Sequence, residues 1–193
     1  MLTRYCIALL LIVASALARA DAPRTQTLAL DARSRVDFEV KVLWLVGVHG
    51  RFNRVHGTIT LDHFHNSAAV DAQIDANNVS MRNKGHEDWV KSPEFFDAQH
   101  YPTIEFVSET IPLRRLQSGG EIEGMLTLRG VTKKVRLELE VPDCPATSGD
   151  NCPIEASGTI RRSDFGMHSR HGTLSDKVEL NFTIYLHETE RTQ

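Results

Sequence analysis

Hydrophobic and polar positions alternate along most of this chain. Val36, Phe38, Val40 and Val42 are separated by charged residues, so the apolar side chains fall on one face of an extended segment. The same period of two recurs over residues 70–76, 122–128, 135–141 and 178–186. Because successive side chains of a strand point to opposite faces, each segment predicts a half-buried β-strand.

Strands with only one apolar face are typical of antiparallel sheets, since parallel sheets are covered on both faces. Further apolar runs extend the pattern at residues 25–30, 46–52, 57–61, 103–108 and 154–161. Helical periodicity is almost absent. So many strands in one domain curl into a barrel or a sandwich. We therefore predict an all-β fold, a single antiparallel β-barrel of about eight strands.

One segment breaks the alternation. Ser92 and Pro93 provide a favourable cap and first turn for a helix, and Pro102 prevents a helix from continuing. A short helical segment near residues 84–99 is therefore predicted between two strands. Its aromatic pair, Phe95 and Phe96, predicts an apolar lid.

The first twenty residues have the pattern of a secretory signal. Arg4 precedes the apolar run Ile7–Val13, and Ala18-Arg19-Ala20 gives a small-residue cleavage site. We expect residues 1–20 to be cleaved and residues 21–193 to form one domain. The apolar run is too short to span a bilayer, and no other stretch approaches the roughly 20 residues required. No integral membrane segment is expected.

Cysteine usage agrees with export. Cys6 leaves with the signal, and Cys144 and Cys152 lie in a loop rich in Pro, Gly, Ser and Asp. In an oxidising compartment this pair predicts a disulfide. Metal ligation and free thiols remain alternatives, although structural zinc requires four ligands and no histidine is near.

Charge and motifs limit the function classes. The chain has 22 Lys and Arg against 25 Asp and Glu, a net charge of −3, which does not favour nucleic-acid binding. His63 with His65, and the segment 86–88, lack a third ligand at metal-site spacing. Neither a nucleophile elbow nor a phosphate-binding glycine loop is present. We expect no catalytic residue, no metal and no cofactor.

Four motifs in order resemble the YceI-like family. They are residues 34–40 followed by 50–52 and 57–59, residues 92–97 with 101–106, residues 124–132 and residues 162–167. The second motif reads Ser-Pro-Glu-Phe-Phe-Asp and Tyr-Pro-Thr-Ile-Glu-Phe, and the last reads Arg-Ser-Asp-Phe-Gly-Met. The resemblance covers nearly the whole mature chain. It implies a small, often periplasmic protein with a lipocalin-like barrel. It also implies a long apolar interior that holds a polyisoprenoid or a related lipid, including quinone tails.

The apolar faces supply the candidate ligand contacts. They are Phe38, Val40, Val42, Ile74, Phe106, Leu126, Leu137, Leu139, Leu180 and Phe182, with Trp89, Phe95 and Phe96 closing one end. An ordinary packed core and a helix lying flat over a barrel mouth are the alternatives at each position. Arg162 or Ser163 would hold a head group in one interpretation, whereas a turn ending a strand is the favoured one.

These observations predict a periplasmic protein that carries or sequesters an amphiphile with a long isoprenoid or acyl tail. The only partner required is that lipid, and the formation of a homodimer stays open. The alternatives are a stress-response or interaction module with a packed barrel and, less favoured, a metal-dependent enzyme that uses the histidine clusters.

Overall fold

The computed structural model describes residues 25–144, 151–170 and 172–188. These residues form one antiparallel sheet. Its longer strands are β1 Thr25–Leu30, β2 Arg35–Val42, β3 Val46–Phe52, β4 Val55–Asp62, β5 Ser67–Asp75, β7 Thr103–Ser108, β9 Gly120–Leu128, β10 Val131–Leu139, β11 Ile154–Arg161 and β12 Leu174–Ile184. Its shorter ones are β6 Val79–Met81, β8 Ile111–Pro112 and β13 Leu186–Glu188. The helical elements are α1 Lys84–Lys91, α2 Arg115–Ser118 and the 3-10 helix η2 Arg162–Phe165. The all-β prediction is confirmed.

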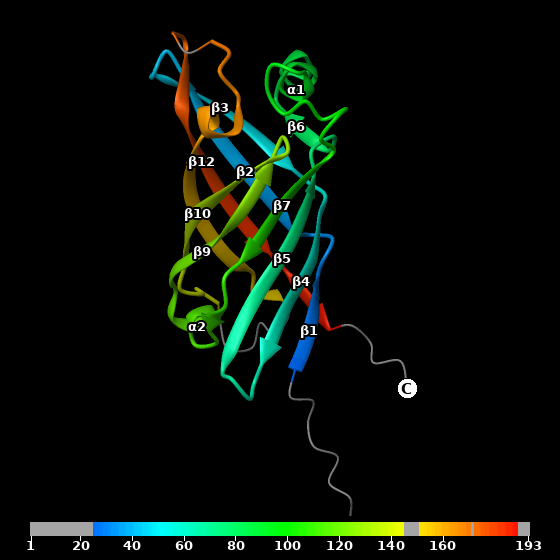
Figure 1. The fold of residues 1–193 in the computed structure, drawn as a ribbon, viewed down its shortest axis with the longest axis vertical. Helices are drawn as coiled ribbons and strands as arrows, with labels where there is room; N and C mark the ends of the chain where they lie inside the picture. Colours follow the sequence, from blue (N-terminus) through cyan, green and yellow to red (C-terminus); the bar gives the residue numbers. More distant parts are fainter. Residues whose placement is uncertain (1–24, 145–150, 171, 189–193) are drawn as a thin grey trace, which may run out of the picture.

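The sheet closes into a lipocalin-like barrel because several strands are two consecutive pieces. β12 pairs with β2, and its continuation β13 pairs with β1, through Thr183 opposite Arg35 and Leu186 opposite Leu30. β3 and β4 likewise pair with β2 and β1 in turn. The thirteen strands thus combine into about eight long, bent strands that surround one interior (Figure 1).

A buried serine holds the bend between the two pieces. The hydroxyl of Ser34 accepts a hydrogen bond from the Tyr185 amide at 3.1 Å and donates one to the Tyr185 carbonyl at 3.2 Å. The Asp31 amide donates to the same carbonyl at 2.8 Å. Tyr185 is the residue at which β12 gives way to β13, so these bonds satisfy backbone groups where the ladder changes partner.

The predicted alternation sorts side chains between the interior and solvent. Val36 and Phe38 of β2, like Ala72 and Ile74 of β5, are buried, and the polar residues between them, Asp37 and Gln73, point outward. Two predicted boundaries differ. β10 ends at Leu139, so that Val141 is exposed, and the last predicted strand is interrupted at Tyr185.

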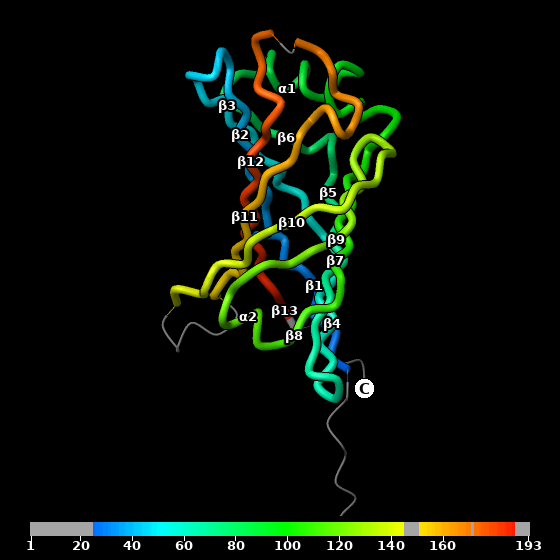
Figure 2. The backbone as a smooth tube through the Cα atoms, turned by 60° about the vertical axis from the view of Figure 1, so that its left-hand side comes forward, coloured from blue at the N-terminus to red at the C-terminus, as the bar shows by residue number. Residues whose placement is uncertain are grey.

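The barrel wall is incomplete at one end, where α1 lies. Within the described chain β6 pairs with β3 alone, and no ladder joins it to β7. The segment between β6 and β7 carries α1 and a series of turns. Figures 1 and 2 both place α1 at this end and α2 at the opposite one.

The helix begins where the predicted helical segment begins, at Lys84, and ends earlier, at Lys91. Asn83 caps it by accepting a hydrogen bond from the Gly85 amide at 2.8 Å, and Ser92 ends it. Ser92 is therefore a C-terminal cap, and the prediction that it starts a helix was wrong. Pro93 cannot continue α1 and restricts Ser92 to an extended conformation, so residues 93–101 follow as turns.

Candidate functional site

A cavity of about 140 Å³ lies inside the barrel beneath α1 and the turns that follow it. β2 and β12 supply one wall, and β5 and β9 supply residues on the other. The predicted contacts that border the cavity are Phe38, Val40, Val42, Ile74, Trp89, Phe95, Phe96, Leu126, Leu180 and Phe182. Residues far apart in the sequence are thus brought together by closure of the sheet.

Phe106, Leu137 and Leu139, which were predicted as lining residues, do not border this cavity. All three are buried, but they belong to the filled part of the interior. A methyl group built on Gly124 would lie 2.6 Å from the Phe106 ring, and one on Gly158 would lie 2.4 Å from a Leu137 methyl. These side chains therefore lie flat over glycines, which leaves no space beneath them.

Other lining residues were missing from the sequence prediction. They are Val36, Val48, Phe52, Met81, His86, Val90, Ile104, Leu128, Ile160, Arg162, Met167, Leu174 and Val178. Several of them, such as Val36, Leu128 and Val178, share the alternating faces already identified, so the same pattern could have found them. Met81, His86 and Met167 lie at strand ends, in α1 or in a loop, where no periodicity marks them.

Three aromatic rings pack together at the cavity. The ring centroids of Phe38 and Phe52 are 5.4 Å apart, and that of Phe96 lies 5.8 Å from Phe38 and 5.4 Å from Phe52. Edge-to-face pairs at such distances stabilise by about 0.5–1.5 kcal/mol beyond area burial. Phe96 comes from the segment after α1, so this cluster attaches that segment to the barrel wall.

A second contact joins the same segment to the loop after η2. The guanidinium of Arg170 stacks over the Trp89 ring at 4.7 Å from its centroid, and its Nε lies 3.8 Å from the Glu94 carboxylate. Trp89 Nε1 donates to that carboxylate at 2.9 Å. We call these three residues the latch. It links α1 and its following turn to the loop that carries Arg170, across the end of the barrel.

Glu87 fixes the start of α1. Its buried carboxylate accepts a hydrogen bond from the Met81 amide at 3.1 Å and pairs with Lys84. The hydrogen bond from Lys84, followed by that from the Met81 amide, holds the pKa of the Glu87 carboxyl below its usual range. The ionised form therefore connects the helix to β6 at neutral pH.

Arg162 is almost wholly buried, and its hydrogen bonds are to backbone. The guanidinium donates to the carbonyls of Met167 and Ser169 at 2.7 Å, Ser175 at 2.9 Å and Leu174 at 3.2 Å. Burial lowers the pKa of Arg162, although Asp176 opposes the shift. These bonds shape the loop between η2 and β12, which agrees with the favoured sequence interpretation of a turn.

Ser163 has an equally structural set of partners. Its amide and its hydroxyl donate to the Asp176 carboxylate at 3.0 Å and 2.8 Å. The cavity wall itself is almost entirely carbon, so it suits an apolar group.

The histidine clusters lie outside the cavity or at its edge. His65 pairs with Asp62 at 2.6 Å in the turn between β4 and β5, and the His65 hydrogen bond lowers the pKa of the Asp62 carboxyl. Among the described residues no group of three or more His, Cys, Asp or Glu side chains has a metal-binding arrangement.

The structure tests one of the two predictions that concern export. Cys144 and Cys152 are joined in a disulfide, with their Cα atoms 5.9 Å apart. The predicted signal segment, residues 1–20, lies outside the described residues. Over the ranges that are described, no helix has the length and apolar character needed to cross a membrane.

Solved structures share this fold. A protein of Burkholderia cenocepacia named BcnA has 24% identity and a TM-score of 0.67, covering 80% of this chain and 98% of its own. A polyisoprenoid binding domain from Saccharophagus degradans has 16% identity and a TM-score of 0.63, covering 84% and 98%. A Campylobacter jejuni YceI protein has 25% identity and a TM-score of 0.59, covering 72% and 85%.

Sequence relatives give the same family. Protein YceI of Salmonella arizonae is 31% identical over 155 residues, which cover 77% of this chain and 78% of the relative. A UPF0312 protein of Pseudomonas aeruginosa is 30% identical over 153 residues with the same coverage. The family model described as a YceI-like domain matches residues 29–186, which run from β1 to β13. The chain therefore belongs to the YceI-like family.

Proposed function

We propose that this protein binds an amphiphile through a long isoprenoid or acyl tail in the barrel interior. The observation that carries the proposal is the almost wholly carbon-lined cavity beneath α1. The name of the Saccharophagus degradans neighbour, a polyisoprenoid binding domain, supports an isoprenoid as the tail. The proposed mechanism is reversible burial of apolar surface, with no bond chemistry.

The size of the cavity defines how a long tail must enter. A cavity of about 150 Å³ in another protein holds one benzene molecule, whereas ligand pockets usually measure about 300–1,000 Å³. The 140 Å³ found here is enough for the first apolar group of a tail. A longer tail requires Trp89, Phe95 and Phe96 to move with the segment that carries them.

Burial of the tail provides enough free energy for useful affinity. Each buried methylene contributes about 0.8 kcal/mol, against association costs of about 4–15 kcal/mol. A micromolar dissociation constant corresponds to about 8 kcal/mol net. A tail of a few isoprene units therefore suffices, without a charged contact to its head group.

The proposed location is the periplasm. Residues 1–20 would direct export and would then be cleaved. There the protein would carry or sequester its lipid, which needs neither a cofactor nor nucleic acid. We infer a binding protein rather than an enzyme because the cavity wall is almost wholly carbon and the Saccharophagus degradans neighbour is named a polyisoprenoid binding domain.

A chain-length series tests the proposal. Isoprenols of one to four isoprene units are titrated into the purified protein, and each added unit that is buried should tighten binding at least tenfold. Val40→Phe, which places a ring in the cavity, should weaken binding at least tenfold. Leu137→Met is the control, because it replaces a side chain in the filled part of the interior by one of nearly the same volume. This variant should bind as the natural protein does.

Affinity independent of chain length, or equal loss in both variants, would contradict the proposal. The alternative is an interaction module with a packed barrel, which the small cavity volume favours. It predicts no uptake of any isoprenol and no lipid in an organic extract of protein purified from its own periplasm. A stoichiometric isoprenoid in that extract, identified by mass spectrometry, excludes this alternative.

A further inference from the structure

The hairpin between β2 and β3 ends in four consecutive exposed apolar side chains. Leu43, Trp44, Leu45 and Val46 are 55%, 63%, 87% and 61% exposed. We call this segment the apolar tip. Figure 1 shows that the hairpin reaches the end of the barrel where α1 lies, opposite the end that carries β1 and α2. Contiguous exposed apolar residues of this kind usually mark an interaction site.

The backbone holds these side chains outward. Leu43 and Trp44 have φ angles of 49° and 59°, in the left-handed region that bulky residues rarely adopt and that hairpin turns usually fill with Asn or Gly. The Leu45 amide donates to the Val42 carbonyl at 3.1 Å, which closes the turn. Folding alone does not explain large apolar residues at these exposed positions, so we infer that they contact a binding partner.

The tip is continuous with the cavity. Val42 and Val48, on the two strands that lead into and out of the turn, both line the cavity. The Leu43 amide donates to the Thr173 carbonyl at 2.7 Å, and the next residue, Leu174, pairs with Val42 and also lines the cavity. A partner that binds the apolar tip therefore also lies next to the end of the barrel that contains the cavity.

The shape of the tip favours a lipid surface over a protein. A stable protein interface uses about 20–30 residues on each side, far more than a four-residue turn presents. Insertion into a bilayer interface needs only a few apolar side chains, and tryptophan is preferred at that depth. We propose that the apolar tip inserts into a bilayer surface and sets the cavity end of the barrel against it.

Charges near the tip are balanced, which sharpens the proposal. Lys177 pairs with Glu179 at 3.0 Å, and Glu39 lies close to His49 at 3.7 Å. Lys41 also lies on this hairpin and contributes to lowering the pKa of Glu179, after Lys177. Insertion would therefore be driven by apolar contact, and vesicle binding should change little with salt.

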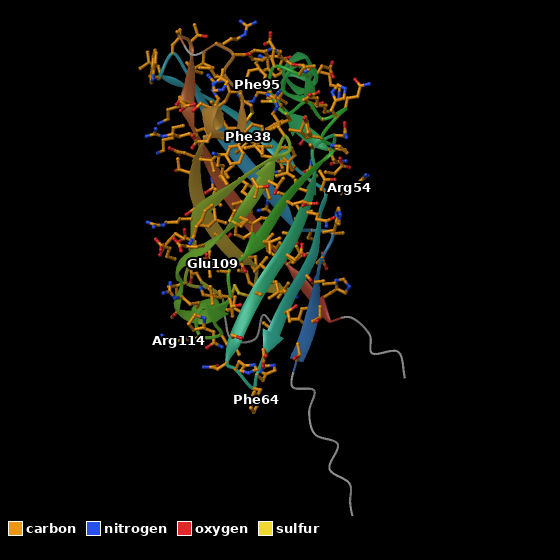
Figure 3. All side chains as sticks on the ribbon, viewed as in Figure 1. Phe38, Arg54, Phe64, Phe95, Glu109 and Arg114 are labelled. Carbon is orange, nitrogen blue, oxygen red and sulfur yellow. A yellow bond between two sulfur atoms is a disulfide. The ribbon has the colours of Figure 1, made fainter. Side chains whose placement is uncertain are left out.

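Flotation with vesicles tests the proposal on the full mature protein. The vesicles contain phosphatidylethanolamine and phosphatidylglycerol, with no isoprenoid. Trp44→Ser combined with Leu45→Ser should lower the bound fraction at least tenfold. Phe64→Ser is the control, because Phe64 is 71% exposed at the opposite end of the barrel and should leave vesicle binding unchanged (Figure 3).

Fluorescence gives a second readout that does not depend on folding of the double variant. The chain has two tryptophans, Trp44 and Trp89. On addition of vesicles the emission should shift to shorter wavelength, and Trp44→Phe should remove that shift while the protein still floats. Equal flotation of the tip variant, equal loss in Phe64→Ser, or a shift that persists in Trp44→Phe would overturn the proposal.

A second copy of the chain is the alternative partner for the apolar tip. A dimer in sedimentation that the tip substitutions convert to a monomer, without vesicle binding by either form, would overturn the proposal. The inference goes beyond ligand binding and does not need it, since the vesicles lack isoprenoid. Isoprenol uptake measured without vesicles separates failure of docking from failure of the proposed function.

Discussion

Two parts of one barrel interior are built from the same alternating pattern and filled differently. Around Phe38 and Phe96 the interior has a cavity beneath α1 and the turns 93–101, which we call the lid, and this part is the cavity region. Around Phe106, Leu137 and Leu139 side chains fill the space, and we call this the packed region. Both regions are lined by buried apolar residues at every second position, so alternation alone does not distinguish them.

Glycine contacts explain part of the difference. The three atoms nearest to a methyl group added to Gly50 all belong to the Phe38 ring, the first at 2.2 Å. One added to Gly124 would meet both the Phe106 ring and the Val107 carbonyl, each at 2.6 Å. In the packed region rings are thus confined by backbone as well as by side chains, whereas in the cavity region a ring has free space beside it. Whether the interior can hold a ligand depends on whether such a ring can move.

The largest expected effect comes from truncating the packed region. Phe106→Ala should lower the free energy of unfolding by about 3–5 kcal/mol, because Phe106 is buried and its neighbours cannot close the space. Phe96→Ala, at the lid of the cavity region, should cost less than half as much, since Phe96 is only partly buried. Urea unfolding followed by circular dichroism measures both. Equal losses would mean that the two regions are packed alike.

Isoprenol uptake distinguishes the same pair of variants. Folded Phe106→Ala protein should bind its ligand as the natural protein does, because Phe106 does not border the cavity. Phe96→Ala should change affinity measurably. An uptake defect in Phe106→Ala alone would place the ligand in the packed region.

Adding one methyl group compares the regions more finely. Gly124→Ala should destabilise by about 2–3 kcal/mol, because the Val107 carbonyl cannot move aside. Gly50→Ala should cost about 1 kcal/mol, since the Phe38 ring can turn into the cavity, and it should also weaken ligand binding. Thermal unfolding and isoprenol titration give the two quantities. A larger stability loss for Gly50→Ala would contradict the comparison.

The sequence predicted the barrel well because its strands are amphipathic. Val36 to Val42 and Val178 to Ile184 each have one apolar face, and the structure pairs them across the cavity wall. The bends are harder to predict. Ser34 and Tyr185 stabilise a change of strand partner through contacts between residues 151 positions apart, and no local pattern encodes such a contact.

The candidate site was predicted less completely for a physical reason. Periodicity marks which residues face inward, but whether the inside is filled depends on side chains from several strands at once. Leu137 and Leu180 have the same sequence signature, yet only Leu180 borders the cavity. Arg162 and the latch depend on loop geometry. Ser92 was assigned to the wrong end of the helix because a Ser-Pro pair suits either end.

A moderate effect is expected from opening the latch, which is present only in the cavity region. Arg170→Ala removes the stacking on Trp89 and the ion pair with Glu94, each an exposed contact of about 0.5–1 kcal/mol. Ligand release should become several-fold faster, with little change in unfolding. Arg170→Lys keeps the charge and loses the planar stack, so it should give an intermediate rate.

Stopped-flow displacement of a fluorescent isoprenol measures the release rates of these variants. Arg136→Ala is the control, since Arg136 pairs with Glu123 on the outer face, away from the lid. Release that is unchanged in Arg170→Ala would show that the latch does not limit exit.

The smallest expected effect is the acid response of the lid. The pKa of Glu87 is lowered in the folded protein, so its stabilising contribution is complete above the ordinary value of 4.5 and is lost as the pH falls through the lowered pKa. Hydrogen bonds to Lys84 and the Met81 amide should then weaken, and α1 should loosen. Asp31, Asp62, Glu123 and Glu179 also have lowered pKa values, so overall stability falls in the same acid range and does not isolate Glu87.

A local readout is therefore needed. The Met81 amide resonance should titrate below pH 4.5 in the natural protein and stay constant in Glu87→Gln, which keeps an acceptor oxygen without a titrating charge. The amide of Phe106, in the packed region, should be unaffected in both proteins because Phe106 lies away from the carboxyls with lowered pKa values. Titration of both amides together would mean that acid acts on the whole barrel, and the lid would then not be the separately adjustable part of the structure.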